Sequence, residues 1–474
     1  MAEIVEDVTG LFKKELGPGS KVLLVNPPVH EKRYNWIRWN QPLDLLRLST
    51  ALKEMHPGLQ TRLFDFMLPD ERGEVQKHKV KETWRGGRDD EQLWHFGRPY
   101  EEFESDLGAF MEQDGWVPDW IIVTSLTSYW HSPIEKLLPK LILRLGRRHR
   151  PATTIALCGY YPRFERDHAA DQWDADRVLV GRLPVGSAGP DFELYLRESA
   201  RRLPNFFALD IEHPNVESHL ELCLSLRHAQ NVKKQITRPT SITVAFFNDD
   251  VCSERSRLDN VANFATAQSK KTLVVEGICG LIPERLKLHQ LDLLKQSGFR
   301  TLFLEHARTS GGGTRKHDYQ DVLMCLGEER RRRASGDADT LWADRGNITA
   351  FVNVGLPDDD MDKLVESTLW LNSAFQAIIL KPFGYSPTLD HATMEARRRR
   401  WPQPRASSPQ WLPYADGPSG LSKDDYQNLF GWQNLLNRRV KGATFDFLDE
   451  DSAVALLVRE TLVAESWRTR KGSE

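Results

Sequence analysis

Residues 21–28 read KVLLVNPP, and this stretch decides the first part of the fold. Lys21–Asn26 is a continuous apolar run closed by two prolines, a pattern typical of a strand buried on both faces of a parallel sheet. After it, residues 42–56 place apolar side chains at helical spacing behind a proline, and residues 60–66 alternate like a strand. The three segments predict one strand, helix and strand unit.

The same alternation continues to about residue 181. It predicts further strands at residues 119–125, 153–157 and 176–180, with a helix at residues 134–145. Strands and helices in alternation predict an α/β fold with a Rossmann-like, doubly wound parallel sheet, in which ligands bind beyond the carboxyl ends of the strands. The polar segment of residues 70–115 interrupts this pattern. It is either a lid over the sheet or an extended surface excursion.

A second series follows the turn-rich residues 183–190 (LPVGSAGP), which are typical of a domain linker. It contains predicted strands at residues 241–247, 272–276, 301–305, 349–354 and 377–380, and predicted helices at residues 285–296, 319–333 and 359–374. Repeated units of this kind predict a parallel sheet curved as a full or partial (β/α) barrel. The remaining chain is polar with two apolar helical stretches. We expect three domains, at residues 1–190 (with the insertion at 70–115), 191–390 and 391–474, the last a helical C-terminal region.

Length and composition exclude several classes of protein. The chain has 474 residues, of which 40% are hydrophobic, so it is long enough for two or three packed domains and is neither fibrous nor disordered. The formal net charge of −3 gives no reason to expect a nucleic-acid partner. The sequence has no run of about 18 consecutive apolar residues, so no membrane span is predicted, and its amino terminus lacks a signal-peptide pattern. Five widely spaced cysteines predict a reducing, cytoplasmic location.

Polar residues and glycines follow the ends of the strands predicted in the first domain. Hydroxyl groups after one strand and a glycine after the next allow a nucleotide-like tail to lie between strand end and helix. A GxGxxG dinucleotide motif is absent. The candidate cofactor-binding residues are Asn26, Pro27, Thr124, Ser125, Leu126, Thr127, Cys158, Gly159, Tyr160, Tyr161, Gly181 and Arg182.

Five segments in this order resemble the cobalamin-binding radical SAM family: VNPP at 25–28, PLDLL at 42–46, TSLTSYW at 124–130, LCGYYP at 157–162 and ADRVLVGR at 175–182. The resemblance covers about residues 20–390. It implies a cobalamin-binding domain followed by a radical SAM-like barrel, with Ser125, Thr127 and Gly159 holding the cobalamin tail. Two positions depart from the family pattern, since Cys158 replaces a glycine and Arg182 replaces a glutamate.

The second domain also resembles this family, at residues 246–250 (FFNDD), 353–357 (NVGLP) and 383–388 (FGYSPT). The family holds a four-iron cluster by three thiolates of a CxxxCxxC loop. Here no two cysteines are close enough to form part of that loop, and its expected place at residues 221–234 keeps only Cys223. We therefore expect a divergent member with no iron–sulfur cluster and no reductive cleavage of S-adenosylmethionine. Whether S-adenosylmethionine binds stays open.

Other candidate residues have competing interpretations. Asp249, Asp250, Glu276 and Glu305 end successive predicted barrel strands and suit acid–base or substrate-anchoring roles, but structural hydrogen bonds or helix caps also explain them. His30 lies where other cobalamin proteins place a lower axial imidazole, although DxHxxG is absent and a loop histidine is the alternative. Residues 311–313 (GGG) would cradle a phosphate at a helix start or form a flexible loop.

These observations lead to two hypotheses of different class. The first is a cobalamin-dependent enzyme without a cluster, in which cobalt carries methyl transfer or Co–C radical chemistry on a small organic substrate. The alternative is a non-catalytic cobalamin-binding sensor, carrier or pseudoenzyme partner of an intact radical SAM paralogue. Neither hypothesis includes a membrane or nucleic-acid partner.

Overall fold

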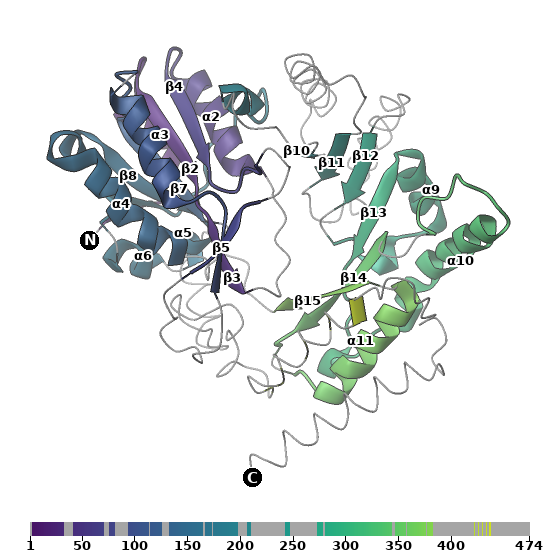
Figure 1. Ribbon diagram of the computed structural model, residues 1–474. Coiled ribbons are helices and arrows are strands. Elements are labelled where there is room, and N and C mark those ends of the chain that lie inside the picture. The colour runs from purple at the N-terminus through teal and green to yellow at the C-terminus, as the bar shows by residue number, and fades with distance from the viewer. Residues whose placement is uncertain are drawn as a thin grey trace, which may run out of the picture.

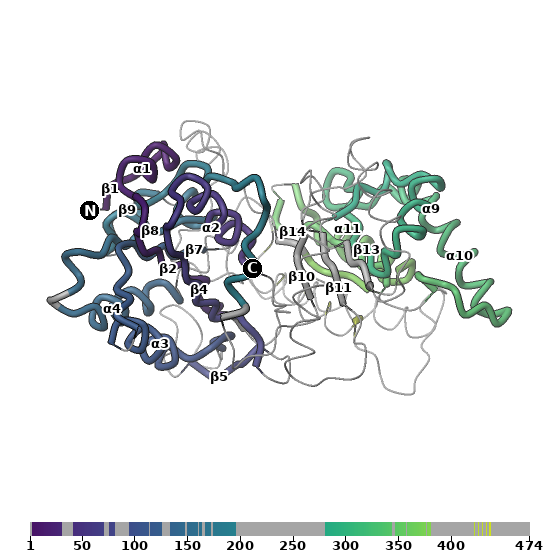
Figure 2. Tube along the Cα trace, turned by 90° about the horizontal axis from the view of Figure 1, so that it is seen from above, coloured from purple at the N-terminus to yellow at the C-terminus, as the bar shows by residue number. Residues whose placement is uncertain are grey.

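The computed structural model contains two lobes, each built on a parallel sheet, which lie beside one another in two perpendicular views (Figures 1 and 2). The residues that the structure describes are 2–32, 41–70, 75–80, 93–112, 114–125, 132–164, 166–172, 174–197, 206–209, 242–246, 273–277, 280–343, 347–356, 358–375, 377–382, and the single positions 421, 425, 429, 433, 436 and 437. The helical region predicted at 391–474 lies almost entirely outside them.

The first sheet has six parallel strands in the order β1-β9-β8-β7-β2-β4. The bounds are β1 Glu3–Val5, β2 Lys21–Asn26, β4 Gln60–Asp65, β7 Trp120–Ser125, β8 Thr154–Gly159 and β9 Arg177–Leu179. The chain passes from β2 to β4 on one side and then returns to place β7 on the other side of β2. The connections therefore reverse direction between β2 and β7, which is the topological switch point of this sheet.

Helices cover both faces of the first sheet. On β2, Val22 and Leu24 share a buried cluster with α1 (Val8–Glu15) and α2 (Leu43–Met55). Leu23 and Val25 point to the other face and pack in a cluster with helices α3, α4, α5 and α6. The bounds of those helices are α3 Tyr100–Glu112, α4 Ser132–His149, α5 Tyr160–Phe164 and α6 Arg166–Gln172, and the short η1 (Arg150–Ala152) follows α4. An unbroken apolar strand between two helical layers explains the continuous run in the sequence.

The segment of residues 70–115, predicted as a lid or a surface excursion, has two structural parts. In the first part, β5 (Lys77–Lys79) and β6 (Leu93–Phe96) join β3 (Val29–Lys32) from earlier in the chain in a small antiparallel sheet of order β3-β6-β5. Helix α3 packs in the core, where the ring of Phe103 lies 4.8 Å from Phe64 and 5.4 Å from Phe66 between centroids. The second half of the segment thus supplies the helix between β4 and β7.

The segment predicted as a linker packs on α2. Thr50 Oγ1 donates to the carbonyl of Gly189 at 2.5 Å, and Asp191 Oδ2 accepts from Ser49 Oγ at 2.6 Å and from Lys53 Nζ at 2.5 Å. The short helix η2 (Phe192–Arg197) then buries Tyr195 against the first sheet. These contacts attach the chain to the first lobe as far as η2.

In the part of the chain that the structure describes, the second sheet contains six parallel strands in sequence order, β10-β11-β12-β13-β14-β15. The bounds are β10 Phe206–Leu209, β11 Ile242–Phe246, β12 Leu273–Gly277, β13 Phe299–Leu304, β14 Ile348–Val354 and β15 Ile378–Pro382. The helices described between them are η3 Pro283–Arg285, α9 Leu288–Gln296, η4 Ser310–Gly312, η5 Lys316–Tyr319, α10 Gln320–Ala334 and α11 Met361–Phe375. The prediction of an α/β protein with mostly parallel sheets is confirmed.

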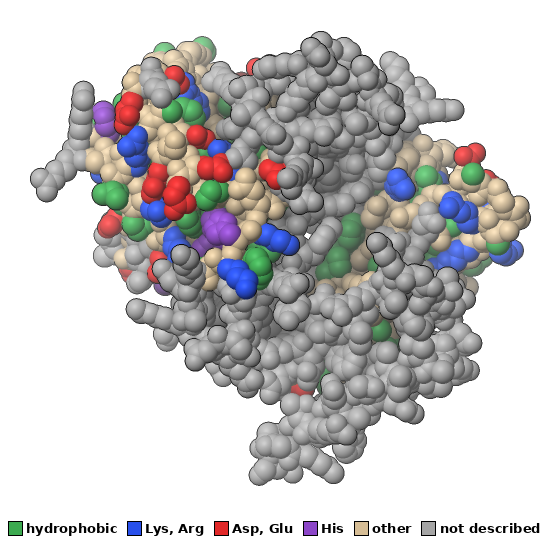
Figure 3. All heavy atoms as spheres, viewed as in Figure 1, with side chains coloured by type: hydrophobic (Ala, Val, Ile, Leu, Met, Phe, Trp, Pro, Cys, Tyr) green, Lys and Arg blue, Asp and Glu red, His purple; other side chains and the backbone are tan. Residues whose placement is uncertain are grey.

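The surface carries charges of both signs. On the face shown in Figure 3, described Lys and Arg side chains are interspersed with Asp and Glu side chains over the first lobe. The arginine run at residues 330–333 lies on α10, where Arg332 pairs with Asp337 at 2.5 Å. In the described part of the chain, no helix is both long and apolar enough to span a membrane.

Candidate functional site

The carboxyl edge of the first sheet gathers several of the predicted site residues. Asn26 ends β2, Ser125 ends β7 and Gly159 ends β8. In the parallel register, Thr124 lies opposite Cys158 and Ser125 opposite Gly159. These residues flank the switch point between β2 and β7, where open parallel sheets bind ligands. Leu126 and Thr127 follow directly but lie outside the described residues.

Asn26 is part of a buried hydrogen-bond network. Its Nδ2 donates to Asp65 Oδ1 at 2.7 Å, and the same oxygen accepts from the backbone N–H of Met67 at 3.0 Å. The other carboxylate oxygen of Asp65 accepts from the hydroxyl of Tyr195 at 2.9 Å. Asp65 is 2% exposed, so these bonds replace the water that a buried carboxylate loses. Sequence reasoning missed Asp65, although it is the polar residue that ends the apolar strand β4.

Cys158, which departs from the family pattern, points into the core rather than beyond the edge. It is fully buried in the cluster that packs against α1 and α2. Burial raises the pKa of its thiol to about 12, although a hydrogen bond with Thr124 acts in the opposite direction. The side chain therefore stays a neutral thiol and is not a reactive thiolate. Cys158 and Cys325 are both buried, and neither forms a disulfide.

The two glycines at this edge are required by chain packing. Gly159 has φ of 96°, and a Cβ built there would overlap the carbonyl oxygen of Ser125. At Gly181, a Cβ would overlap the carbonyl oxygen of Glu6. The missing side chain lets the ends of β7 and β8 approach closely in the first case. In the second case it lets residue 181 pack against the turn before α1.

The remaining predicted residues of the first lobe lie in varied surroundings. Pro27 is buried directly after β2, and Arg182 is exposed to solvent. The buried hydroxyl of Tyr161 forms a hydrogen bond with His168 Nδ1. Tyr160 begins α5. Arg182 thus has the exposure of a surface residue, whereas Tyr161 has that of a core residue.

His30 lies on β3 in a row of three histidines across the small antiparallel sheet. The register pairs His30 with His95, and His95 with His78. His30 Nε2 lies 3.1 Å from His95 Nδ1, and His95 Nε2 lies 2.9 Å from the carbonyl oxygen of Arg98. The rings of His78 and His95 stack with centroids 4.2 Å apart. Sequence reasoning missed His78 and His95, because only strand pairing brings them to His30.

The hydrogen bonds in this row determine which ring nitrogen of His95 and of His30 carries the proton. Burial lowers the pKa of His95 to about 4 and holds the pKa of His30 well below its ordinary value, so both rings are neutral at pH 7. His95 Nε2 faces a carbonyl and must donate to it, which leaves Nδ1 as an acceptor. His30 Nε2 therefore donates to His95 Nδ1. It also approaches the hydroxyl oxygen of Tyr100 at 3.4 Å, and that hydroxyl donates to the carbonyl of Pro133. A nitrogen that carries a proton has no lone pair for cobalt.

The carboxylates predicted at the barrel mouth are described only in part. Asp249 and Asp250 lie outside the described residues, and Glu276 lies on β12 opposite Ala245 and Thr301. Glu305 directly follows β13, and its carbonyl accepts from Tyr319 at 2.8 Å. Its carboxylate lies beside Gly280, where a Cβ would overlap it. Among the described residues, no three His, Cys, Asp or Glu side chains are arranged to hold a metal ion.

Comparison with known proteins gives no family assignment. No family model and no curated protein matches the chain. Its structural neighbours include two structures of TsrM, a radical S-adenosylmethionine methyltransferase from Kitasatospora setae. The one with tryptophan substrate and aza-SAM bound has a TM-score of 0.41 at 11% identity, covering 76% of this chain and 72% of that chain. The one with cobalamin and a [4Fe-4S] cluster bound has a TM-score of 0.40 at 12% identity, covering 77% and 75%.

A third neighbour is the catalytic domain of starch synthase IV from Arabidopsis thaliana, with a TM-score of 0.21 at 12% identity over 96% of this chain and 100% of that chain. At these TM-scores and identities, none of the three likenesses carries an assignment of function. What this chain does must therefore be argued from its own residues.

Proposed function

We propose that the first lobe binds cobalamin at the carboxyl edge of its sheet, and that the chain is a cobalamin-dependent enzyme acting on a small organic substrate. The topology is the observation that carries this proposal. Asn26, Ser125 and Gly159 end neighbouring strands around the switch point, the place where such sheets bind ligands. The five sequence segments that resemble the cobalamin-binding radical SAM family support cobalamin as the cofactor.

The described residues fit the tail of cobalamin in two respects. The side chains that end β2 and β7, Asn26 and Ser125, are polar and uncharged, which suits hydrogen bonding to a nucleotide-like tail. Cys158 does not fill the space beyond the edge, because its side chain is buried in the core. We assign the tail to the hydroxyls of Thr124 and Ser125 and to the backbone around Gly159, with Thr127 as a further proposed contact.

Nε2 of His30 does not suit the role of lower axial ligand, because it donates a hydrogen bond to His95 Nδ1 within the small sheet. We propose that cobalt is held without it. Bound cobalamin supplies a cobalt centre for methyl transfer or Co–C bond homolysis. The lobe's own residues hold the tail, and the absence of a CxxxCxxC motif from the sequence argues against a radical SAM cluster beside it.

Titration of the purified full chain with hydroxocobalamin under anaerobic conditions tests the proposal. Equilibrium dialysis gives the affinity and the visible spectrum reports the cobalt environment. We expect saturable binding that Ser125→Ala weakens by about fivefold, the value of one hydrogen bond of about 1 kcal/mol. Ser20→Ala, which removes a hydroxyl near the opposite end of β2, is the matched control and leaves the affinity unchanged. If no corrin binds, the proposal is wrong.

Two further measurements separate the remaining alternatives. His30→Gln leaves the spectrum of the bound corrin unchanged, and a shift would show that His30 ligates cobalt. A spectrum that changes on illumination or on addition of a methyl donor supports an enzyme. Bound corrin that stays inert under both conditions instead supports the sensor, carrier or partner hypothesis.

A further inference from the structure

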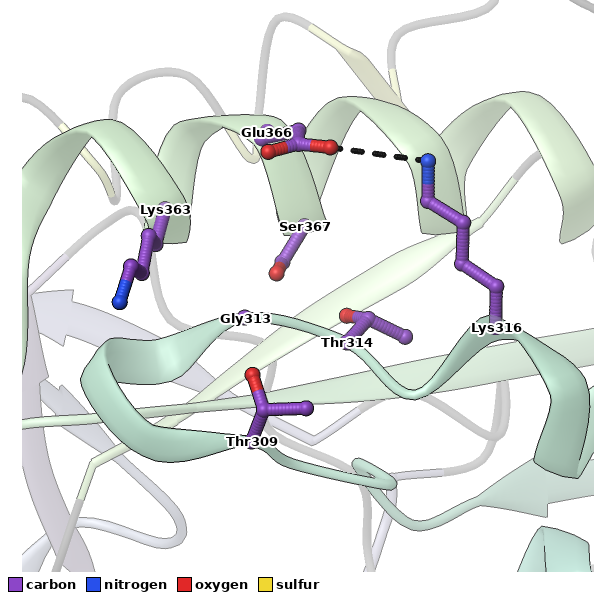
Figure 4. Close-up of a pocket in the computed structure, with 7 residues that line it drawn as sticks. All are labelled: Thr309, Gly313, Thr314, Lys316, Lys363, Glu366 and Ser367. Carbon is purple, nitrogen blue, oxygen red and sulfur yellow. Dashed lines mark ion pairs between the residues drawn. The ribbon is translucent and has the colours of Figure 1, made fainter.

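A cavity of about 220 Å³ lies in the second lobe, between the loop after β13 and the first two turns of α11 (Figure 4). Its lining contains only polar side chains and one glycine. The lining residues are Thr309, Gly313, Thr314, Lys316, Lys363, Glu366 and Ser367. Pockets for drug-sized ligands are larger, roughly 300–1,000 Å³, and mostly apolar. This cavity therefore suits one small polar group rather than a whole cofactor.

The loop of residues 311–313 beside the cavity is held by hydrogen bonds to residues just before and within α11. Gly311 has φ of 78° and Gly312 has φ of 91°, conformations that favour glycine. The N–H of Gly311 donates to Asp358 Oδ2 at 2.9 Å, and its carbonyl accepts from the N–H of Asp360 at 2.9 Å. Ser367 Oγ donates to the carbonyl of Gly312 at 2.8 Å from the helix side. Because the loop is held at several points, the flexible-loop interpretation of residues 311–313 does not fit.

A buried histidine orients the hydroxyl of Thr314. The N–H of Asn353 donates to His306 Nδ1 at 3.2 Å, so the ring proton is on Nε2, which donates to Thr314 Oγ1 at 2.9 Å. Burial, followed by the nearby charge of Arg308, lowers the pKa of His306 to about 4, so the ring is neutral at pH 7. Thr314 already accepts this bond. No described residue accepts its own proton, and Figure 4 shows the hydroxyl directed towards the cavity.

The two lysines give the cavity a positive lining. Lys316 Nζ lies 3.6 Å from Glu366 Oε1, and both side chains are at least half exposed, so this ion pair is weak. Lys363 Nζ lies 3.4 Å from the carbonyl of Ser310, and no carboxylate of the described chain pairs with it. Two ammonium groups against one carboxylate leave one net positive charge.

We infer that this cavity binds a phosphoryl group, either free phosphate or the phosphate of a small ester. Its donors come from both sides, with Thr309 and Thr314 on the loop and Lys363 on the helix (Figure 4). Donors on opposite sides suit a tetrahedral oxyanion better than a planar carboxylate, and lysine binds phosphate as a point charge. The loop follows β13 at the carboxyl end of the strand, the side on which parallel barrels place their ligand sites. The inference does not depend on cobalamin binding.

Calorimetric titration of the full chain, at pH 7.5 and low ionic strength without cobalamin, tests the inference. The probes are inorganic phosphate and phenyl phosphate, with acetate as the carboxylate comparison. We expect saturable binding of a phosphate probe and at least tenfold weaker binding of acetate. Binding of inorganic phosphate alone identifies the free ion as the ligand. Binding of phenyl phosphate as well identifies an ester.

Variants locate the binding in the cavity. Lys363→Gln weakens phosphate binding about fivefold, whereas Lys14→Gln, the same charge change on an exposed residue of the first lobe, leaves it unchanged. Glu366→Gln strengthens binding about threefold, because it removes the opposing charge. Thr314→Val weakens binding and Thr314→Ser restores it, with thermal melting to show that both variants fold.

Three results would overturn the inference. The first is an absence of saturable binding by both phosphate probes. The second is acetate binding as tightly as phosphate, which would mean that the cavity responds to charge alone. The third is a loss in Lys14→Gln equal to that in Lys363→Gln, which would place the anion on the general surface.

Discussion

The two parallel sheets have the same number of described strands but differ in how the chain connects them. The first sheet reverses direction between β2 and β7, so a single switch point concentrates the predicted ligand site there. Among the described strands, the second sheet adds each strand beside the previous one without a reversal, so its loops share one edge without a preferred point. The polar groups differ in burial: they are buried around Asn26 and Ser125, and exposed around Lys363 and Asp358.

We therefore expect the first lobe to tolerate less change at its strand ends than the second lobe does in its outer elements. Buried groups at the switch point have partners on several strands, so one substitution disturbs several contacts. Groups on the exposed loops and helices of the second lobe can move towards solvent instead. Substitutions of matched residue types in the two lobes test this difference.

The largest expected effect comes from substituting a glycine in each lobe. Gly159→Ala forces a Cβ against the carbonyl of Ser125 at φ of 96°, and we expect a loss of at least about 4 kcal/mol in the free energy of unfolding. Gly327→Ala, on α10 with nothing within 4 Å of the new Cβ, stabilises by about 0.5–1 kcal/mol. Urea unfolding followed by circular dichroism measures both. Equal effects of the two variants would contradict the comparison.

The next effect concerns one carboxylate in each lobe. Asp65→Ala leaves Asn26 and Tyr195 without their buried acceptor and costs about 3 kcal/mol. Asp358 also accepts from a backbone N–H and an arginine, but its side chain is 49% exposed, so Asp358→Ala costs about 1 kcal/mol or less. The same urea titration applies. A larger loss at Asp358 than at Asp65 would show that the second lobe is the less tolerant one.

Much of the fold can be predicted from the local sequence pattern, and where the prediction fails there is a physical cause. The apolar runs of β2 and β7 predict buried strands because both faces of each strand are covered. Helix α3 escapes the prediction because its sequence, YEEFESDLGAFME, is acidic, although Tyr100, Phe103 and Leu107 share one buried face. Spacing of i, i+3 and i+7 is the pattern that could have found it.

The candidate site was predictable where it depends on strand ends and not where it depends on pairing between distant segments. The strand predicted at 119–125 ends at Ser125, and Gly159 lies two residues beyond the strand predicted at 153–157, so the sequence places both near strand ends. Asp65 meets Tyr195 across 130 positions, and His30 meets His95 across 65, so no local pattern brings them together. The turn-rich residues 183–190 have the composition of a linker, and only the tertiary contacts show them packed on α2.

Two buried histidines, His95 in the first lobe and His306 in the second, are expected to make the free energy of unfolding depend on pH in the same way. Burial lowers the pKa of both His95 and His306 to about 4, from the ordinary value of 6.5. Between these values the unfolded state binds more protons than the folded state. The stabilisation is therefore complete above pH 6.5 and is lost as the pH falls towards 4. Each histidine contributes a slope of about 1.4 kcal/mol per pH unit in that window.

Urea titrations at pH 7, 6 and 5 measure this slope. His95→Gln and His306→Gln each make the loss of stability towards low pH less steep by the contribution of one proton. A slope that neither buried substitution alters would mean that other groups govern the acid sensitivity.

The smallest expected difference between the lobes comes from two buried tyrosines. Tyr195→Phe removes a hydrogen bond, the donation to the buried carboxylate oxygen Asp65 Oδ2 at 2.9 Å, and costs about 2 kcal/mol, because hydrogen bonds to charged groups contribute more than those between neutral groups. Tyr319 makes two, since its hydroxyl donates to the carbonyl of Glu305 at 2.8 Å and accepts from the N–H of Ala307 at 3.0 Å. Tyr319→Phe leaves both backbone groups without that partner and costs about 2 kcal/mol. If Tyr195→Phe proves clearly the more harmful in urea unfolding, the contact between η2 and β4 stabilises the first lobe by more than the bond to Asp65, since it also holds residues 183–197 against the sheet.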